Sequence, residues 1–209
     1  MVMDNINELI SYSAILYCGI YNIYDKEKRI LNKINKVIID VFPPLLDQIK
    51  DNCDKLDDLV VENYCNSIME NMKEIIEHVK TITFLGEEVV EKVRSDVSSV
   101  GLVFNDDLDD FETYTDKQKK VVINFLKATQ NNSIKAFKDT YSKKDLSFRY
   151  TKVNLQNIAT IVDSMIKTKM VDQYVINIID KIKVDALELT QDIIDLGKPK
   201  EKLLKKLKV

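Results

Sequence analysis

The fold is decided by residues 45–80, LLDQIKDNCDKLDDLVVENYCNSIMENMKEIIEHVK, which contain neither glycine nor proline. Apolar side chains recur there at steps of three and four residues, the spacing that places them on one side of an α-helix. This stripe consists of Leu45, Ile49, Cys53, Leu56, Val60, Tyr64, Ile68, Met72, Ile75 and Val79. It predicts a single helix of about 50 Å at 1.5 Å per residue. A break within residues 51–58, where acids accumulate, is the alternative.

A second long stripe covers residues 153–196. Gly197-Lys198-Pro199 follows it, and glycine first with proline after is the usual order at the end of a helix. The sequence therefore predicts a second long helix that stops at Gly197. Its apolar positions are Val153, Ile158, Ile161, Val162, Met165, Ile166, Met170, Tyr174, Ile178, Ile182, Ala186, Leu189, Ile193 and Leu196.

Turn-forming residues are scarce along the whole chain. It has 209 residues but only four glycines and three prolines, and no proline lies between Pro44 and Pro199. Sheet folds need many more such residues at their turns, so the composition favours an all-α protein.

Shorter helices are expected around the two stripes. One begins near Asp4 and one follows Asp25, with Pro43-Pro44 ending the second because proline disrupts helix geometry. Gly86 and Gly101 are expected to bound another helix, and a short hairpin of residues 81–85 with 100–104 is the alternative there. The segment Thr115–Gln118 matches a capping box, which predicts a helix start.

These features together predict an elongated bundle of about five to seven helices with coiled-coil-like packing, in which residues 45–80 and 153–196 lie antiparallel. We expect one domain over residues 1–197, followed by a basic C-terminal tail at 198–209. No repeat or low-complexity linker divides the chain.

The net charge and the cysteines limit the classes of partner and the cellular compartment that we expect. The net charge is −3, so no general basic field attracts nucleic acid. Cys18, Cys53 and Cys65 lie inside apolar helical patterns, which favours buried free thiols in a reducing compartment. The segment from Ala14 to Tyr24 is too short to span a membrane. No Lys or Arg precedes it, so the basic region of a signal peptide is missing. These observations predict a cytoplasmic protein.

Catalytic motifs are not evident. The glycines are scattered, so no phosphate-binding loop or nucleophile elbow can form, and His78 is the single histidine. We expect His78 to be a solvated surface residue near Glu74, one turn earlier on the same helix. We therefore expect no enzyme activity and no cofactor.

The acidic segment at residues 105–116 is the one candidate metal site in the sequence. An EF-hand frame fits residues 105–116 in part, but position 6 is Asp110 instead of glycine and position 12 is Asp116 instead of glutamate. A solvated loop or a contact with a basic partner is the favoured reading. The ligand positions would fall on Asn105, Asp107, Asp109, Phe111, Thr113 and Asp116.

Two segments are candidate interaction surfaces. The first is aromatic and lies near the N-terminus (Tyr17, Ile20, Tyr21 and Tyr24), although core packing is the favoured interpretation of it. The second is the lysine-rich end (Lys198, Lys202, Lys205, Lys206 and Lys208), although a solubilising tail is the favoured interpretation of it. We expect a protein that binds another protein or its own copies through helical faces. A membrane-associated or pore-forming role, on an anionic membrane, is the alternative, and nucleic acid or small-molecule substrates are not expected.

Overall fold

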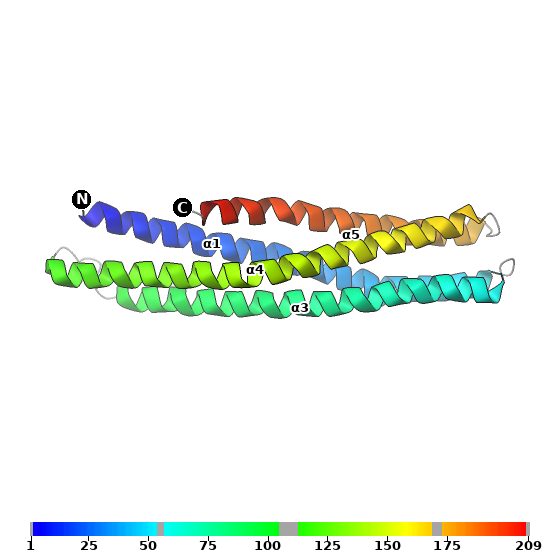
Figure 1. Cartoon of the computed structure of the whole chain (residues 1–209), viewed down its shortest axis with the longest axis horizontal. Coiled ribbons are helices and arrows are strands. Elements are labelled where there is room, and N and C mark those ends of the chain that lie inside the picture. Colours follow the sequence, from blue (N-terminus) through cyan, green and yellow to red (C-terminus); the bar gives the residue numbers. More distant parts are fainter. Residues whose placement is uncertain (1, 54–56, 105–112, 169–172, 208–209) are drawn as a thin grey trace. The chain divides into compact units, whose positions relative to one another are not determined.

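The computed structural model describes residues 2–53, 57–104, 113–168 and 173–207. No strand occurs among these residues, so the all-α prediction is confirmed. The helices form four continuous runs, not the five to seven that were predicted (Figure 1). The first run joins three elements, and the other three are single helices: α1 (Val2–Asn35), η1 (Lys36–Val41) and α2 (Phe42–Asn52); α3 (Asp58–Phe104); α4 (Asp116–Lys167); α5 (Gln173–Lys206).

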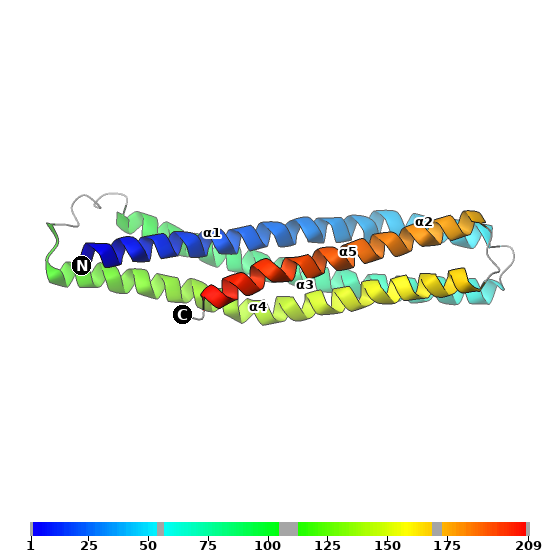
Figure 2. The same ribbon diagram turned by 90° about the horizontal axis from the view of Figure 1, so that it is seen from above.

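The proline pair does not end a helix, contrary to the prediction. Pro43 and Pro44 occupy the first turn of α2, a position where the fixed φ of proline suits the start of a helix. The preceding six residues form the π-helix η1, in which the N–H of Phe42 reaches back five residues to the carbonyl of Val37. This wider turn lets α1 continue into α2, as the ribbon in Figure 2 shows.

The stripe over residues 45–80 is not one helix. It is divided after Asn52, and the alternative break within residues 51–58 is confirmed. Cys53 leaves the helical conformation at φ −93° and ψ 52°. Asp57 then caps α3, since its carboxylate accepts a hydrogen bond from the N–H of Leu59 at 3.0 Å. The turn uses an aspartate cap and needs no glycine or proline.

The second stripe is also divided. Helix α4 ends at Lys167, where the hydroxyl and the N–H of Thr168 both donate to the carbonyl of Met165. Helix α5 starts at Gln173, and both sides of the break supply buried residues to one core. The apolar periodicity therefore continues across a division between two helices that no glycine or proline marks in the sequence.

Helices elsewhere are longer than predicted. Asp25 lies inside α1, while Gly86 and Gly101 lie inside α3, so the hairpin alternative is wrong. Gly197 and Pro199 lie inside α5. The capping box is confirmed: Thr115 N–H donates to Oε1 of Gln118 at 2.9 Å, and the Gln118 N–H donates to the Thr115 hydroxyl at 3.4 Å.

The chain divides into two compact units, and all four helical runs contribute to each. Unit 1 comprises Met1–Asp25, Phe84–Lys143 and Pro199–Val209, and unit 2 comprises Lys26–Thr83 and Lys144–Lys198. Each has its own apolar core. Unit 1 buries Leu16, Tyr17, Ile20, Ile23, Val89, Val93, Phe137, Leu203 and Leu207.

The core of unit 2 is larger and takes side chains from every run. Within this unit α3 and α4 lie antiparallel, because their paired residues change number in opposite directions. Asn157 Nδ2 donates to Asn71 Oδ1 at 3.2 Å, and Asn154 Nδ2 donates to Glu74 Oε2 at 2.9 Å. The buried positions of α1, η1, α2 and α3 there include Leu31, Ile34, Ile38, Phe42, Leu46, Ile49, Val61, Cys65, Ile68 and Ile75.

Candidate interaction surfaces

The aromatic N-terminal segment lies mainly in the core of unit 1. Tyr17 and Ile20 are buried, with 7% and 2% of their surfaces exposed, and Tyr21 packs against the same cluster. Tyr24 is half-buried. Core packing, which the sequence favoured, therefore describes Tyr17 and Ile20, because neither is available as an exposed binding face in this structure.

The lysine-rich end is a docked helix as far as residue 206. Leu203 and Leu207 are buried in unit 1 at 6% and 4% exposure, and Lys200 is buried as well. Lys202, Lys205 and Lys206 are exposed. Lys198 is exposed beside Asp195, with 3.7 Å between Nζ and Oδ1. Lys208 lies outside the described residues.

Three contacts hold this end of α5 within unit 1. The Tyr12 hydroxyl of α1 donates to the carbonyl of Lys206 at 3.3 Å, and Lys138 Nζ of α4 donates to the carbonyl of Leu207 at 3.2 Å. Gly19 of α1 allows a close approach, because a Cβ there would lie 3.0 Å from Cδ1 of Leu203. Helix α5 thus fits against α1 where α1 has no side chain.

Unit 2 carries exposed apolar side chains on the outer side of α4. Leu146, Tyr150 and Val153 are 52%, 50% and 45% exposed, and their spacing of four and three residues places them on one helix face. We call these three residues the α4 row. Sequence reasoning missed them because Val153 was assigned to the buried stripe and the other two were not singled out.

His78 lies beside the α4 row. Its ring stacks on that of Tyr150, with ring centroids 5.1 Å apart and an angle of 10° between the planes. His78 is half-buried, not fully solvated as predicted, and Glu74 is the acceptor for Asn154. Stacking between α3 and α4 holds the Tyr150 ring in one orientation.

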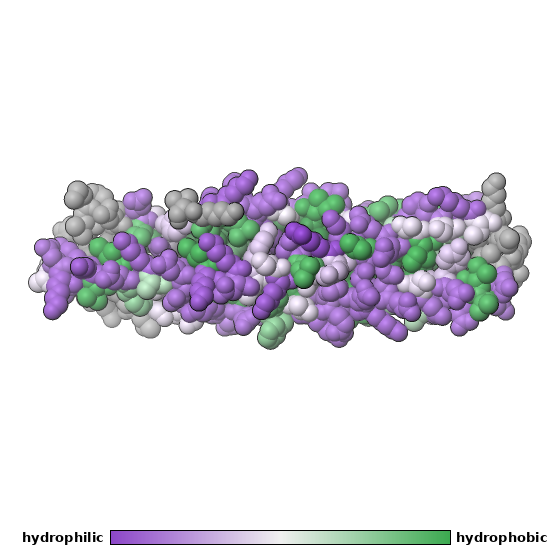
Figure 3. Space-filling model, viewed as in Figure 1, coloured by the Kyte–Doolittle hydropathy of each residue, from purple (hydrophilic) through white to green (hydrophobic). Residues whose placement is uncertain are grey.

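Helix α5 shows a comparable set in unit 2. Val184, Leu187 and Ile194 are 52%, 46% and 46% exposed. Figure 3 shows hydrophobic residues in small groups among hydrophilic ones over the visible face. Contacts to a partner there would therefore combine short apolar rows with surrounding polar groups.

A groove of about 490 Å³ lies between α3 and α4 in unit 1. Its walls carry charges of both signs beside the apolar side chains of Leu85, Val89 and Ala136. A smaller hollow of about 280 Å³ lies beside Cys53 in unit 2. The larger groove is lined by Leu85, Glu88, Val89, Lys92, Asn132, Lys135, Ala136, Asp139, Thr140 and Lys143.

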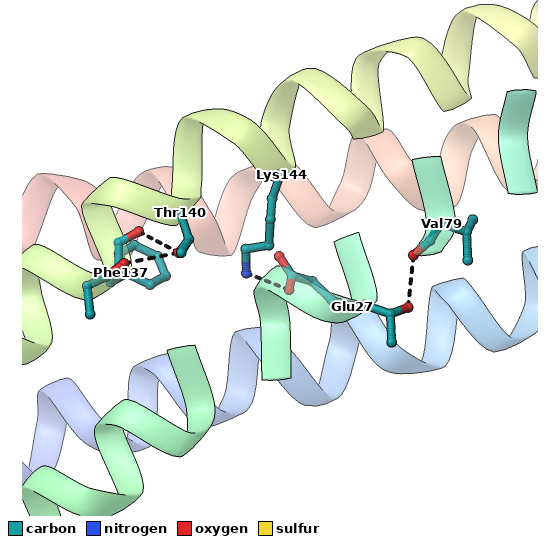
Figure 4. Close-up of polar contacts among 7 residues, drawn as sticks. Glu27, Val79, Phe137, Thr140 and Lys144 are labelled. Atoms are coloured by element: carbon teal, nitrogen blue, oxygen red, sulfur yellow. Dashed lines mark hydrogen bonds and ion pairs between the residues drawn. The ribbon is translucent and has the colours of Figure 1, made fainter. Parts of the chain in front are cut away.

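Buried polar side chains connect the helices inside each unit. In unit 2, Lys144 Nζ of α4 lies 2.9 Å from Glu27 Oε2 of α1, and Figure 4 shows the two side chains pointing toward each other. In unit 1, the Ser133 hydroxyl donates to Asp96 Oδ2 at 2.7 Å, and Lys92 Nζ lies 2.8 Å from Asp96 Oδ1. Such contacts fix which residues of two helices face each other.

The cysteines occupy two environments. Cys53 and Cys65 are buried free thiols, as predicted, but Cys18 is exposed on α1. Burial raises the pKa of the Cys65 thiol, and the nearby Lys50 charge opposes this effect. The Cys65 thiol is therefore a poor nucleophile at neutral pH, because the thiolate is the reactive form.

Within the described residues, no cluster of three or more His, Cys, Asp or Glu side chains could hold a metal ion. The EF-hand frame falls mostly outside them, since Asn105, Asp107, Asp109 and Phe111 are not described. Asp116 begins α4. No helix in the described part of the chain is long and apolar enough to cross a membrane.

No protein-family model matches the chain, and the search of curated proteins finds no significant match.

Proposed function

We propose that this chain is a non-enzymatic protein that binds another protein through an exposed helical face of unit 2. The α4 row carries this proposal. Outward positions of a surface helix are usually polar, whereas contiguous exposed apolar residues mark interaction sites. Here three large apolar side chains, each about half exposed, follow one another at helical spacing.

Tyr150 is suited to be the anchor of this contact. Buried tyrosines are enriched among the residues that contribute most to binding free energy, and an ordered ring loses little conformational freedom on binding. The stacked His78 ring supplies that order. This contact also gives the single histidine of the chain a packing role.

The partner surface that fits is an amphipathic helix. A row with steps of four and three residues on α4 is complementary to a second helix with apolar residues at the same spacing. That helix can come from a second copy of the chain or from a different protein, and sedimentation of the purified protein distinguishes the two.

Site-specific crosslinking tests the proposal. A photoreactive phenylalanine analogue replaces Tyr150 in one sample and Val121 in a control, since Val121 is 63% exposed and lies in unit 1. We expect an intermolecular product from position 150 and none from position 121. Leu146→Glu in the same chain should abolish that product, because it places a charge in the apolar contact.

Sedimentation of the purified protein identifies the partner. A concentration-dependent dimer that Leu146→Glu dissociates would show self-association. A monomer at all concentrations would require a crosslink to another protein in native extract, reproduced with purified components. A monomer without any such crosslink would overturn the proposal.

A further inference from the structure

The last turns of α5 display lysines on one fixed side. Leu203 and Leu207 face the core of unit 1 and are 6% and 4% exposed, while Lys202, Lys205 and Lys206 remain exposed. Because the leucines are held in the core, the lysines have a defined direction. As far as Leu207, the segment is therefore a docked basic helix and not a free tail.

Neighbouring helices extend this surface. Tyr12 and Gly19 of α1 both touch the end of α5, and Ile15 lies between them at steps of three and four residues. Ile15 is 54% exposed, so an apolar side chain borders the lysines. On the α4 side, exposed Lys138 hydrogen bonds to the carbonyl of Leu207. We call Ile15, Lys138, Lys202, Lys205 and Lys206 the lysine face.

The composition of this face fits a diffuse negative surface. Residues 198–207 contain five lysines and one acid, Glu201. Lysine is a compact, strongly hydrated charge, unlike arginine, which forms bidentate contacts with individual groups. Each basic residue close to an anionic membrane raises the affinity about fivefold.

We propose that the lysine face binds the headgroups of an anionic lipid membrane while unit 1 stays folded. Insertion of α5 as an amphipathic helix is not part of this contact, because its leucines are already buried in the core. Ile15 adds a small apolar contact at the membrane boundary. The proposal does not depend on the proposed protein contact, which uses unit 2.

Vesicle co-sedimentation tests it with the full chain. The vesicles contain equal parts of phosphatidylserine and phosphatidylcholine, and pure phosphatidylcholine is the neutral comparison. We expect binding to the anionic vesicles at low salt and its loss at high salt, because exposed charges are screened. The triple variant Lys202→Gln, Lys205→Gln, Lys206→Gln should weaken binding roughly a hundredfold.

A matched triple variant provides the control. Lys117, Lys120 and Lys127 are exposed lysines of α4 in unit 1, and their replacement by Gln removes the same charge. Circular dichroism checks that both triple variants remain helical. The control should bind vesicles nearly as well as the unmodified chain, while Ile15→Ser should weaken binding without changing its salt dependence.

Three results would overturn the proposal. The first is no binding to anionic vesicles at low salt. The second is an equal loss of binding in both triple variants, which would show a general charge effect. The third is binding of a soluble polyglutamate peptide in the absence of vesicle binding, which would assign the face to an acidic protein.

Discussion

Lys144 Nζ lies 2.9 Å from Glu27 Oε2, and both side chains are almost completely buried, at 4% and 2% exposure. The two residues belong to α4 and α1, which are separated by 117 positions in the sequence. Removing two charges from water costs free energy, so a buried ion pair is stable only while both of its charges are present. Their contact therefore makes the alignment of α1 against α4 in unit 2 specific.

Replacing one member of this pair should be more harmful than replacing both. Lys144→Met leaves the Glu27 carboxylate without its charged partner in the interior, and we expect a loss of about 3–5 kcal/mol in the free energy of unfolding. The double variant Glu27→Leu, Lys144→Met should recover most of that loss. Urea denaturation followed by circular dichroism measures the free energy of unfolding of the unmodified chain and of both variants. A double variant that is no more stable than Lys144→Met would contradict this account.

Gly19 should control the docking of the end of α5. Gly19→Leu places a large side chain where Leu203 already lies 3.0 Å from a Cβ position, so overpacking should cost about 1–3 kcal/mol. Hydrogen exchange followed by mass spectrometry should show faster exchange in residues 199–207. Unchanged exchange there would show that the contact does not hold the segment.

Gly197, which lies in α5 itself, supplies the control. No atom lies within 4 Å of a Cβ at this position, so Gly197→Ala meets no obstacle. Alanine is the better helix former by about 1 kcal/mol. We expect a stabilised protein, measured as a higher urea midpoint, with exchange in residues 199–207 no faster than in the unmodified chain.

Asp163 should make unit 2 sensitive to acid. Hydrogen bonds from Lys167 and Lys183 lower the pKa of its carboxyl from 3.8 to about 2. A lowered folded-state pKa means that its stabilising effect is complete above pH 3.8 and is lost as the pH falls through about 2. Asp163→Asn should lower the thermal midpoint at neutral pH, and the difference from the unmodified chain should vanish near pH 2. Asp195→Asn, in an exposed pair, is the control and should change little at either pH.

Tyr17 should make unit 1 sensitive to alkali. Burial raises the pKa of its phenol, an effect that the Ser133 hydroxyl opposes and the Asp96 carboxylate reinforces. A raised folded-state pKa gives stability that is full below the ordinary value of about 10 and declines as the pH rises through the folded value. Tyr17→Phe should therefore lose less stability above about pH 10 than the unmodified chain. Tyr174→Phe removes an exposed tyrosine and should leave the alkaline loss unchanged.

The periodicity of the sequence predicted buried positions better than helix ends. Ile68, Ile75, Ile182 and Leu196 were assigned to buried stripes and are buried. The turns after Cys53 and Thr168 were missed or left as an alternative, because neither contains glycine or proline. An aspartate caps the start of α3 and a threonine hydroxyl bonds the end of α4, and both residue types are also common within charged helical surfaces.

The candidate interaction residues were likewise predicted only in part. The sequence identified the lysines of the C-terminal segment, but not which of its residues are exposed. Tyr17 and Ile20 were candidates for an interaction surface, with core packing favoured, and packing of four helical runs buries them. The α4 row could not be found from periodicity, since Val153 fits a buried stripe as well as an exposed one.

The sequence by itself determined the all-α class, the apolar stripes and the helix start at Thr115. These depend on local spacing and on contacts between residues a few positions apart, so one segment contains all the information they need. The tertiary structure decided that helices pass through Pro43, Gly86 and Pro199, and which apolar side chains remain exposed. Those outcomes depend on the free energy of packing against distant segments, which overrides local preference where the burial gained is larger.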